Sequence, residues 1–135
     1  MVKINVLIDN QPGDDALLEC EHGLSFYIET GCSRVLCDMG ASEKFICNAS
    51  RMGIDLSAID FAFVSHGHAD HTGGLPDYLR TLGEKKVYLS ERISKEMYFS
   101  SRRGSRRDIS TEWSVFENHQ DRLVSLKESC WITPE

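Results

Sequence analysis

The sequence lacks the features that mark membrane, secreted and repetitive proteins. No apolar run approaches the ~18–20 residues that a membrane-spanning helix needs, and residues 1–9 form a short strand-like run rather than a secretory signal. The chain of 135 residues also contains no internal repeat and no low-complexity segment. We therefore expect a single domain over residues 1–135, located in the cytoplasm and without a membrane partner.

Excess positive charge and paired cysteines are also missing. The net charge of −6 argues against a general nucleic-acid binder. The five cysteines form no Cys-x-x-Cys pair, which argues against an iron–sulfur or redox site and favours reduced thiols. One basic cluster runs from Arg102 to Arg107. We interpret it as a solvated loop; the alternative is a flexible flap whose arginines meet an anionic substrate such as a phosphate.

Hydrophobic patterning predicts strands and helices in alternation. A strand, a helix and a second strand follow one another between residues 34 and 64, which predicts a parallel pair joined by a crossover. Ser42 is expected to cap the first helix and Gly53 to end it, and Gly83 follows the second. The expected strands are 2–8, 24–29, 34–37, 61–64, 86–89, 122–126 and 130–133, and the expected helices are 41–52, 75–82 and 90–98.

The strongest signal lies directly after the apolar run 61–64. Within six positions the chain places His66, His68, Asp70 and His71, which include three of its five histidines. Neutral imidazoles and carboxylates are ligands for zinc, and also for iron or manganese. His66 and His68 are two apart and point to the same side of an extended backbone, whereas Asp70 and His71 are adjacent and point apart. The spacing therefore predicts two neighbouring metal positions.

The pattern His-x-His-x-Asp-His, followed by Thr-Gly-Gly, resembles the metal-binding signature of the metallo-β-lactamase-fold hydrolases. Within that superfamily the chain is most similar to the branch related to the synthase of a dihydropterin-linked ribofuranosylaminobenzene phosphate in methanopterin biosynthesis. The residues that carry this narrower resemblance are Asp9, Asn10, His22 to Phe26, Leu36 to Gly40, Asn48, Ala49, Gly53 to Leu56 and Ser65 to Leu75.

The resemblance implies an α/β fold, namely the N-terminal half of the αββα sandwich, with a mixed sheet and helices on its outer face. It implies dinuclear metal–hydroxide chemistry on an ester, phosphate or pterin-type small molecule, with two zinc ions expected and iron or manganese left open. Asp70 is the expected catalytic residue as well as a ligand. Asp38 is expected to hold the metal loop in place, and Asn10, His22 and Asn48 are expected to border the substrate pocket.

Counting ligands leaves this site incomplete. The resemblance assigns a further His, a bridging Asp and a final His to the C-terminal half of the fold, whereas this chain has only His22 and His119 left. We interpret His119 as a surface residue. We therefore expect a truncated chain, or one completed by a missing C-terminal half. A homodimer would cover the open face of the sheet without supplying those ligands. The alternative function is a non-catalytic half-domain with an incomplete metal site.

Overall fold

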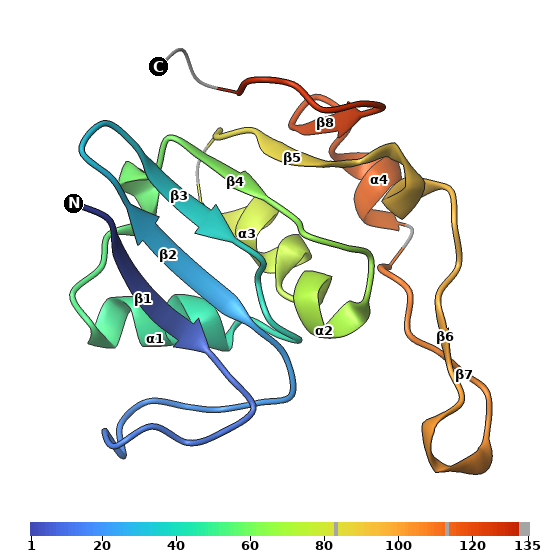
Figure 1. Cartoon of the computed structure of the whole chain (residues 1–135), viewed down its shortest axis with the longest axis horizontal. Coiled ribbons are helices and arrows are strands. Elements are labelled where there is room, and N and C mark those ends of the chain that lie inside the picture. Colours follow the sequence, from blue (N-terminus) through green and yellow to red (C-terminus); the bar gives the residue numbers. More distant parts are fainter. Residues whose placement is uncertain (83, 113, 133–135) are drawn as a thin grey trace.

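A six-stranded mixed sheet runs through the computed structural model, which describes residues 1–82, 84–112 and 114–132 (Figure 1). Its strands are Lys3–Ile8 (β1), Ser25–Glu29 (β2), Arg34–Cys37 (β3), Phe61–Phe63 (β4), Val87–Ser90 (β5) and Leu123–Leu126 (β8). Their spatial order is β1-β2-β3-β4-β5-β8. The first three pair antiparallel, and β3, β4, β5 and β8 pair parallel. The predicted parallel pair is confirmed by β3 and β4, and β2 and β3 form an antiparallel hairpin.

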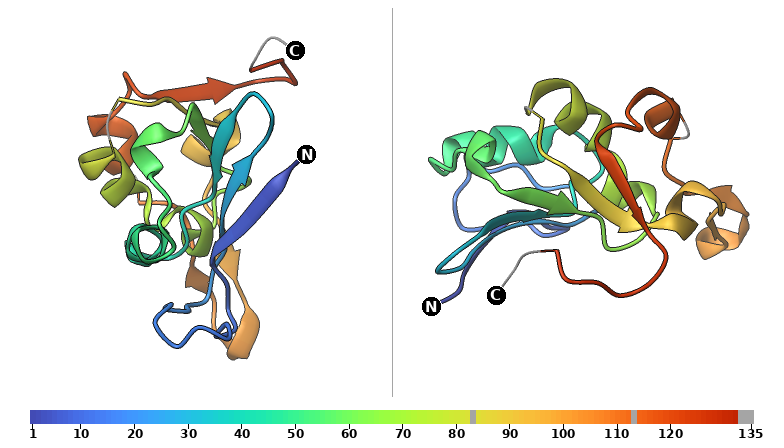
Figure 2. Two further views of the ribbon diagram at one scale, coloured as in Figure 1. Left: turned by 90° about the vertical axis from the view of Figure 1, so that its left-hand side faces the viewer. Right: turned by 90° about the horizontal axis from the view of Figure 1, so that it is seen from above.

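The helices lie on one side of this sheet (Figure 2). They span Lys44–Arg51 (α1), Ala69–Thr72 (α2), Leu75–Thr81 (α3) and Ser114–Asn118 (α4). The side chains that alternate toward them, such as Leu36, Ala62 and Val87, are fully buried. They form one core with Phe45 of α1 and Tyr78 of α3. No helix in the described ranges has the length and apolar character needed to cross a membrane.

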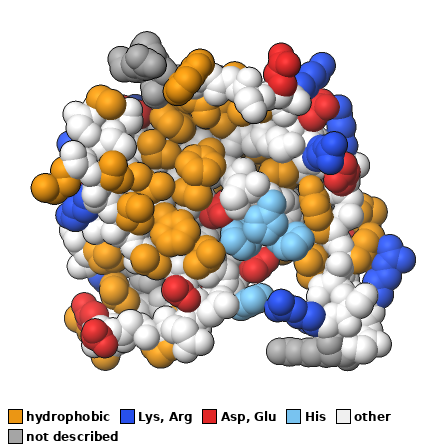
Figure 3. Space-filling view, in the orientation of Figure 1, with side chains coloured by type: hydrophobic (Ala, Val, Ile, Leu, Met, Phe, Trp, Pro, Cys, Tyr) orange, Lys and Arg blue, Asp and Glu red, His pale blue; other side chains and the backbone are white. Residues whose placement is uncertain are grey.

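The opposite face of the sheet is open and apolar. Figure 3 shows hydrophobic side chains gathered over β1, β2 and β3 on this face. Val2, Ile4 and Val6 are 62%, 59% and 46% exposed. Phe61 and Phe63 of β4 are only half-buried. An all-apolar strand such as β4 is typical of a sheet covered on both faces, but the described residues cover only the helix side completely.

Two expected elements at the C-terminal end are wrong. Of the expected helix 90–98 only a 3-10 turn forms, at Glu91–Ser94 (η2). Tyr98 instead pairs across the chain: its N–H donates to the Ser110 Oγ at 2.8 Å, and its carbonyl accepts from the Ile109 N–H at 2.9 Å. Residues 130–132 form no strand, and Thr133 lies outside the described residues. Tertiary pairing therefore overrides the weak local helix signal.

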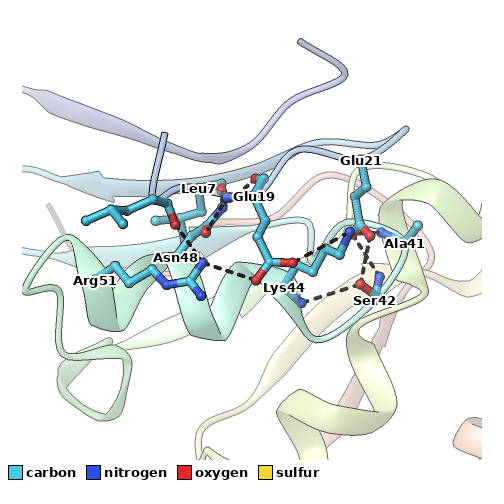
Figure 4. Close-up of polar contacts among 9 residues, drawn as sticks. Leu7, Glu19, Glu21, Ala41, Ser42, Lys44, Asn48 and Arg51 are labelled. Atoms are coloured by element: carbon cyan, nitrogen blue, oxygen red, sulfur yellow. Dashed lines mark hydrogen bonds and ion pairs between the residues drawn. The ribbon is translucent and has the colours of Figure 1, made fainter. Parts of the chain in front are cut away.

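The start of α1 differs from the expected one because a distant side chain occupies its amides (Figure 4). Glu21 Oε1 accepts hydrogen bonds from the Ala41 and Ser42 N–H groups at 2.9 and 3.0 Å, and Oε2 accepts from Ser42 Oγ at 2.7 Å. The helix begins at Lys44 and Glu43 is its N-cap residue, but Ser42 Oγ still accepts from the Lys44 N–H at 3.4 Å. Gly53, with φ of 70°, follows its end as predicted. Gly83 lies outside the described residues.

Candidate metal centre

The predicted ligands lie on the tight segment that follows β4 and includes the short helix α2, which we call the metal loop (residues 65–72). The loop is pressed against the backbone of residues 39–41. The Met39 N–H donates to the His71 carbonyl at 2.9 Å, and the Gly73 N–H donates to the Gly40 carbonyl at 2.9 Å. A Cβ on Gly73 would lie 2.2 Å from the Ala41 carbonyl oxygen. Glycine is therefore required for this close approach, which fixes the loop to the end of β3.

Asp38, directly after β3, is the residue that holds the metal loop. It is 2% exposed and has a left-handed φ of 56°, a conformation that Asp tolerates better than most residues. Its Oδ1 accepts from the Ser65 N–H at 2.7 Å. Its Oδ2 accepts from Ser65 Oγ at 2.6 Å and lies 2.8 Å from His71 Nδ1. The Asp38 carboxylate therefore joins Ser65 and His71 within the metal loop.

These contacts determine which ring nitrogens are free. An ionised carboxylate only accepts hydrogen bonds, so this contact requires a proton on His71 Nδ1, and in the neutral ring Nε2 then keeps its lone pair. The Ser65 hydroxyl gives its one proton to Asp38, so its oxygen accepts from His66 Nδ1 at 2.9 Å. His66 Nε2 is then free as well. One buried carboxylate thus orients two imidazoles, one directly and one through Ser65.

The three histidines of the loop form one cluster. The His66 ring centroid lies 4.4 Å from that of His68 and 4.1 Å from that of His71. Burial lowers the pKa of His66, and the neighbouring His71 and His68 lower it further, which favours the neutral, ligating form. His71 Nε2 also lies 3.7 Å from Asp70 Oδ2. His71 therefore lies close both to His66 of the first predicted pair and to Asp70 of its own pair.

Asp70 has a second histidine neighbour. His22 Nε2 lies 3.5 Å from Asp70 Oδ2, and His22 Nδ1 lies 3.2 Å from Asn10 Oδ1. The same Asn10 oxygen accepts from the Gly23 N–H at 2.8 Å. Asn10 therefore anchors the His22 imidazole on the side away from Asp70, and His22 lines the cavity beside the metal loop.

The structure corrects the expectation for Asn48. This α1 residue is 1% exposed, and its Nδ2 donates to the carbonyls of Leu7 and Glu19 at 2.7 and 2.8 Å (Figure 4). Its Oδ1 accepts from the Glu19 N–H at 3.0 Å. Both amide hydrogens and the oxygen are engaged in tying α1 to β1 and the following loop. Asn48 is a structural residue and does not line the cavity.

A cavity of about 970 Å³ opens beside the metal loop. His22, His68 and Asp70 line one part of it. The other wall comes from residues 99–112, including Arg102 and Arg107 of the basic cluster. Sequence reasoning missed this wall because its approach depends on contacts between segments far apart in the chain. His119, by contrast, is not part of the cavity lining.

The donors of the metal loop suit a divalent ion in type, in protonation and in mutual proximity. Among the residues that the structure describes, however, no group of three or more His, Cys, Asp or Glu side chains is arranged to hold an ion. The site therefore fits the metal as a partial ligand set, with pairs of donors rather than a closed shell.

Comparison with known proteins decides the family. The family model of the metallo-beta-lactamase superfamily matches residues 18–126. The chain belongs to the metallo-β-lactamase superfamily. The sheet, its one-sided helices and the metal loop are thus the superfamily's α/β fold, as the sequence resemblance predicted.

Individual relatives agree with this superfamily and with the predicted branch. The 7,8-dihydropterin-6-methyl-4-(β-D-ribofuranosyl)-aminobenzene-5′-phosphate synthase of Methanocaldococcus jannaschii is 32% identical over 89 residues, which cover 62% of this chain and 30% of the synthase. Tm1679, a metal-dependent hydrolase of the β-lactamase superfamily, is 29% identical in sequence and superposes with a TM-score of 0.67. The match covers 93% of this chain and 41% of Tm1679. A B3 metallo-β-lactamase with an active-site glutamic acid shares the fold, at 21% identity and a TM-score of 0.54, over 83% of this chain and 42% of its own. The chain spans less than half the length of each.

Proposed function

We propose that this chain provides part of a divalent-metal site for hydrolase-type or synthase-type chemistry on a small molecule. The substrate would be an ester, a phosphate or a pterin-type compound. The observation that carries the proposal is the Asp38 arrangement. A buried carboxylate at 2.8 Å from His71 Nδ1, and linked through Ser65 to His66, leaves two Nε2 atoms ready to bind metal. Such a carboxylate–histidine pair is typical of metal centres.

The residues of the chain have distinct roles under this proposal. His66 and His68 would hold one ion, and Asp70 and His71 a second. Bound zinc, iron or manganese would polarise the substrate as a Lewis acid and lower the pKa of water. Asp70 would place its carboxylate at the reacting centre, where His22 faces it at 3.5 Å.

A second candidate is a non-catalytic domain with an incomplete metal site. Two observations favour it: no three-donor group is present in the described part of the chain, and one face of the sheet is open. In this case the metal loop would bind an ion weakly, and the domain would act through its surface. Metal retention separates the two candidates because a two-donor site releases its ion readily.

The test is the metal content of the full chain after loading with zinc, manganese or iron and exhaustive dialysis. The first candidate predicts roughly two tightly held equivalents, whereas less than about half an equivalent would reject a self-contained dinuclear site. His71→Gln should reduce the retained metal, and His119→Gln is the matched control because His119 lies outside the cavity. Equal metal loss in both variants would contradict the assignment of the metal loop.

A further inference from the structure

The basic cluster is carried on an arm (residues 98–111) that is joined to the metal loop. The arm contains the two short strands Phe99–Ser100 (β6) and Arg107–Asp108 (β7), with a 3-10 turn at Arg102–Gly104 (η3). Figure 1 shows this hairpin projecting beyond the end of the sheet. At its base the Ala69 N–H donates to the Ile109 carbonyl at 2.7 Å. The arm therefore begins and ends at the metal loop.

Further contacts at this base are buried. Thr111 is 4% exposed, and its Oγ1 lies 2.9 Å from Thr72 Oγ1 and 3.3 Å from the Gly67 carbonyl oxygen. The Tyr98 ring packs edge-on against His68, with 5.4 Å between the centroids. A Cβ on Gly67 would lie 2.6 Å from Tyr98 Cε2, so glycine permits this contact. The arm thus has a defined position relative to the ligands, whereas the sequence suggested a solvated loop or a flexible flap.

Two arginines of the arm face the cavity without a charged partner. Arg102 and Arg107 line it, and neither forms an ion pair with a described residue. The nearby Arg106 differs, since its guanidinium stacks 3.8 Å from the centroid of the Phe99 ring. Figure 3 shows basic charge at the rim of the hollow, beside a histidine that lies below the cluster of the other histidines. Two guanidinium groups at one cavity form a binding surface for a compact dianion.

We propose that Arg102 and Arg107 bind the phosphate group of a phosphate-monoester ligand, whose remaining part extends toward Asp70. This proposal rests on the proposed function and specifies its substrate class. Ser100, Ser101 and Ser110 give the same wall further hydrogen-bonding groups. The acidic residues of the whole cavity lining are Asp70, on the metal loop, and Glu112. Both acidic residues of the lining lie outside the arm (residues 98–111), so the arm is the part of the cavity suited to an anion.

The test uses phenyl phosphate as the probe and phenol as its uncharged match, with binding to the full chain followed by NMR titration in the presence of EDTA. We expect saturable binding of phenyl phosphate that weakens as salt is added, and no binding of phenol. Arg102→Gln and Arg107→Gln should each weaken binding roughly tenfold or more, since each removes charge-assisted hydrogen bonds. Arg106→Gln is the matched control on the same hairpin and should change the affinity less than about twofold.

Several outcomes would overturn the proposal. The first is that phenyl phosphate does not bind, and the second is that Arg102→Gln and Arg107→Gln leave its affinity unchanged. The third is an equal loss of affinity in Arg106→Gln, because that would indicate only a general attraction to basic charge. The amide spectrum of each variant verifies its fold. Metal retention measured on the same variants should match the wild type. If the chain retains no metal but still binds phenyl phosphate in preference to phenol, the proposed function is rejected and the anion site is retained.

Discussion

Replacing Asp38 with Asn tests whether one carboxylate organises the metal loop. The substitution preserves the size of the side chain, and Asn tolerates the left-handed φ of 56° about as well as Asp does. It replaces one acceptor oxygen with an NH₂ group that can only donate. The Asp38 oxygens now face three donors, namely the Ser65 N–H, the Ser65 hydroxyl and the His71 Nδ1–H. The amide must therefore leave at least one of these donors opposite another donor.

The loss of stability can be worked out from the hydrogen bonds that the substitution removes. A hydrogen bond to a charged group contributes about 1.5–3 kcal/mol, and an unsatisfied buried donor costs about 1–3 kcal/mol. We therefore expect Asp38→Asn to reduce the free energy of unfolding by about 2–5 kcal/mol. The hydroxyl of Ser65 can rotate, and His71 can move its proton to Nε2, which lowers the cost. That second adjustment removes the ligating lone pair, so metal affinity should fall by about 10–100-fold.

Urea unfolding, zinc competition titration and the ¹⁵N chemical shifts of the histidine rings measure these effects. In the wild type, the His71 and His66 rings should show protonated Nδ1 and unprotonated Nε2. In Asp38→Asn the His71 signal should shift toward the Nε2–H form. Asp60→Asn is the control, because Asp60 also bonds a backbone N–H, that of Arg34 at 2.7 Å, but on the surface. Unchanged ring tautomers together with unchanged zinc affinity would refute the reasoning.

Three further predictions concern the surroundings of the loop. Gly73→Ala should destabilise the fold by about 1–3 kcal/mol in urea unfolding, because its Cβ would meet a backbone carbonyl oxygen at 2.2 Å, whereas Gly31→Ala, with nothing within 4 Å, should not; equal effects would contradict the close approach. Cys37 should resist thiol reagents at pH 8, since burial and then the Asp38 charge raise its pKa to about 12, while the exposed Cys47 should react; peptide mapping distinguishes them. Because the pKa of His66 is lowered in the folded chain, the native state binds fewer protons than the unfolded state as the pH falls below 6.5, the usual pKa of histidine. The free energy of unfolding is therefore highest above pH 6.5 and decreases below it. His66→Gln should flatten this part of the stability profile in denaturant titrations, and an unchanged slope would contradict the assignment.

Local patterns in the sequence predicted most of the fold because strand alternation and helix spacing are local properties. The hairpin β2–β3 and the helix α3 follow directly from them. The contacts that define α1 could not be predicted in this way, since Glu21 reaches amides about 20 residues away and Asn48 bonds a carbonyl 41 positions earlier in the chain. No local pattern distinguishes such an Asn from one that faces a pocket.

In the candidate site, too, local features could be predicted from the sequence and long-range contacts could not. The ligand types and their order are visible in the sequence, and the resemblance pointed to Asp38. The left-handed φ of Asp38, and the protonation that it imposes on His71, require the tertiary structure. For the basic cluster, the sequence suggested a solvated loop, with a flexible flap as the alternative. The contacts of Ile109, Thr111 and Tyr98 with the metal loop, which bring the cluster to the cavity, have no local signal.

The attachment of the metal loop to the sheet has a consequence for its local unfolding. The Asp38 N–H donates to the Phe63 carbonyl at 3.0 Å, and the Gly40 N–H donates to the Leu24 carbonyl at 3.0 Å, so the segment that holds the loop also joins three strands. The loop and the sheet should therefore open as one cooperative unit, with the Ser65 and Gly73 amides exchanging hydrogen as slowly as those of β3. An arriving ion would then stabilise the whole sheet, by about 2.7 kcal/mol at a free concentration 100 times its dissociation constant.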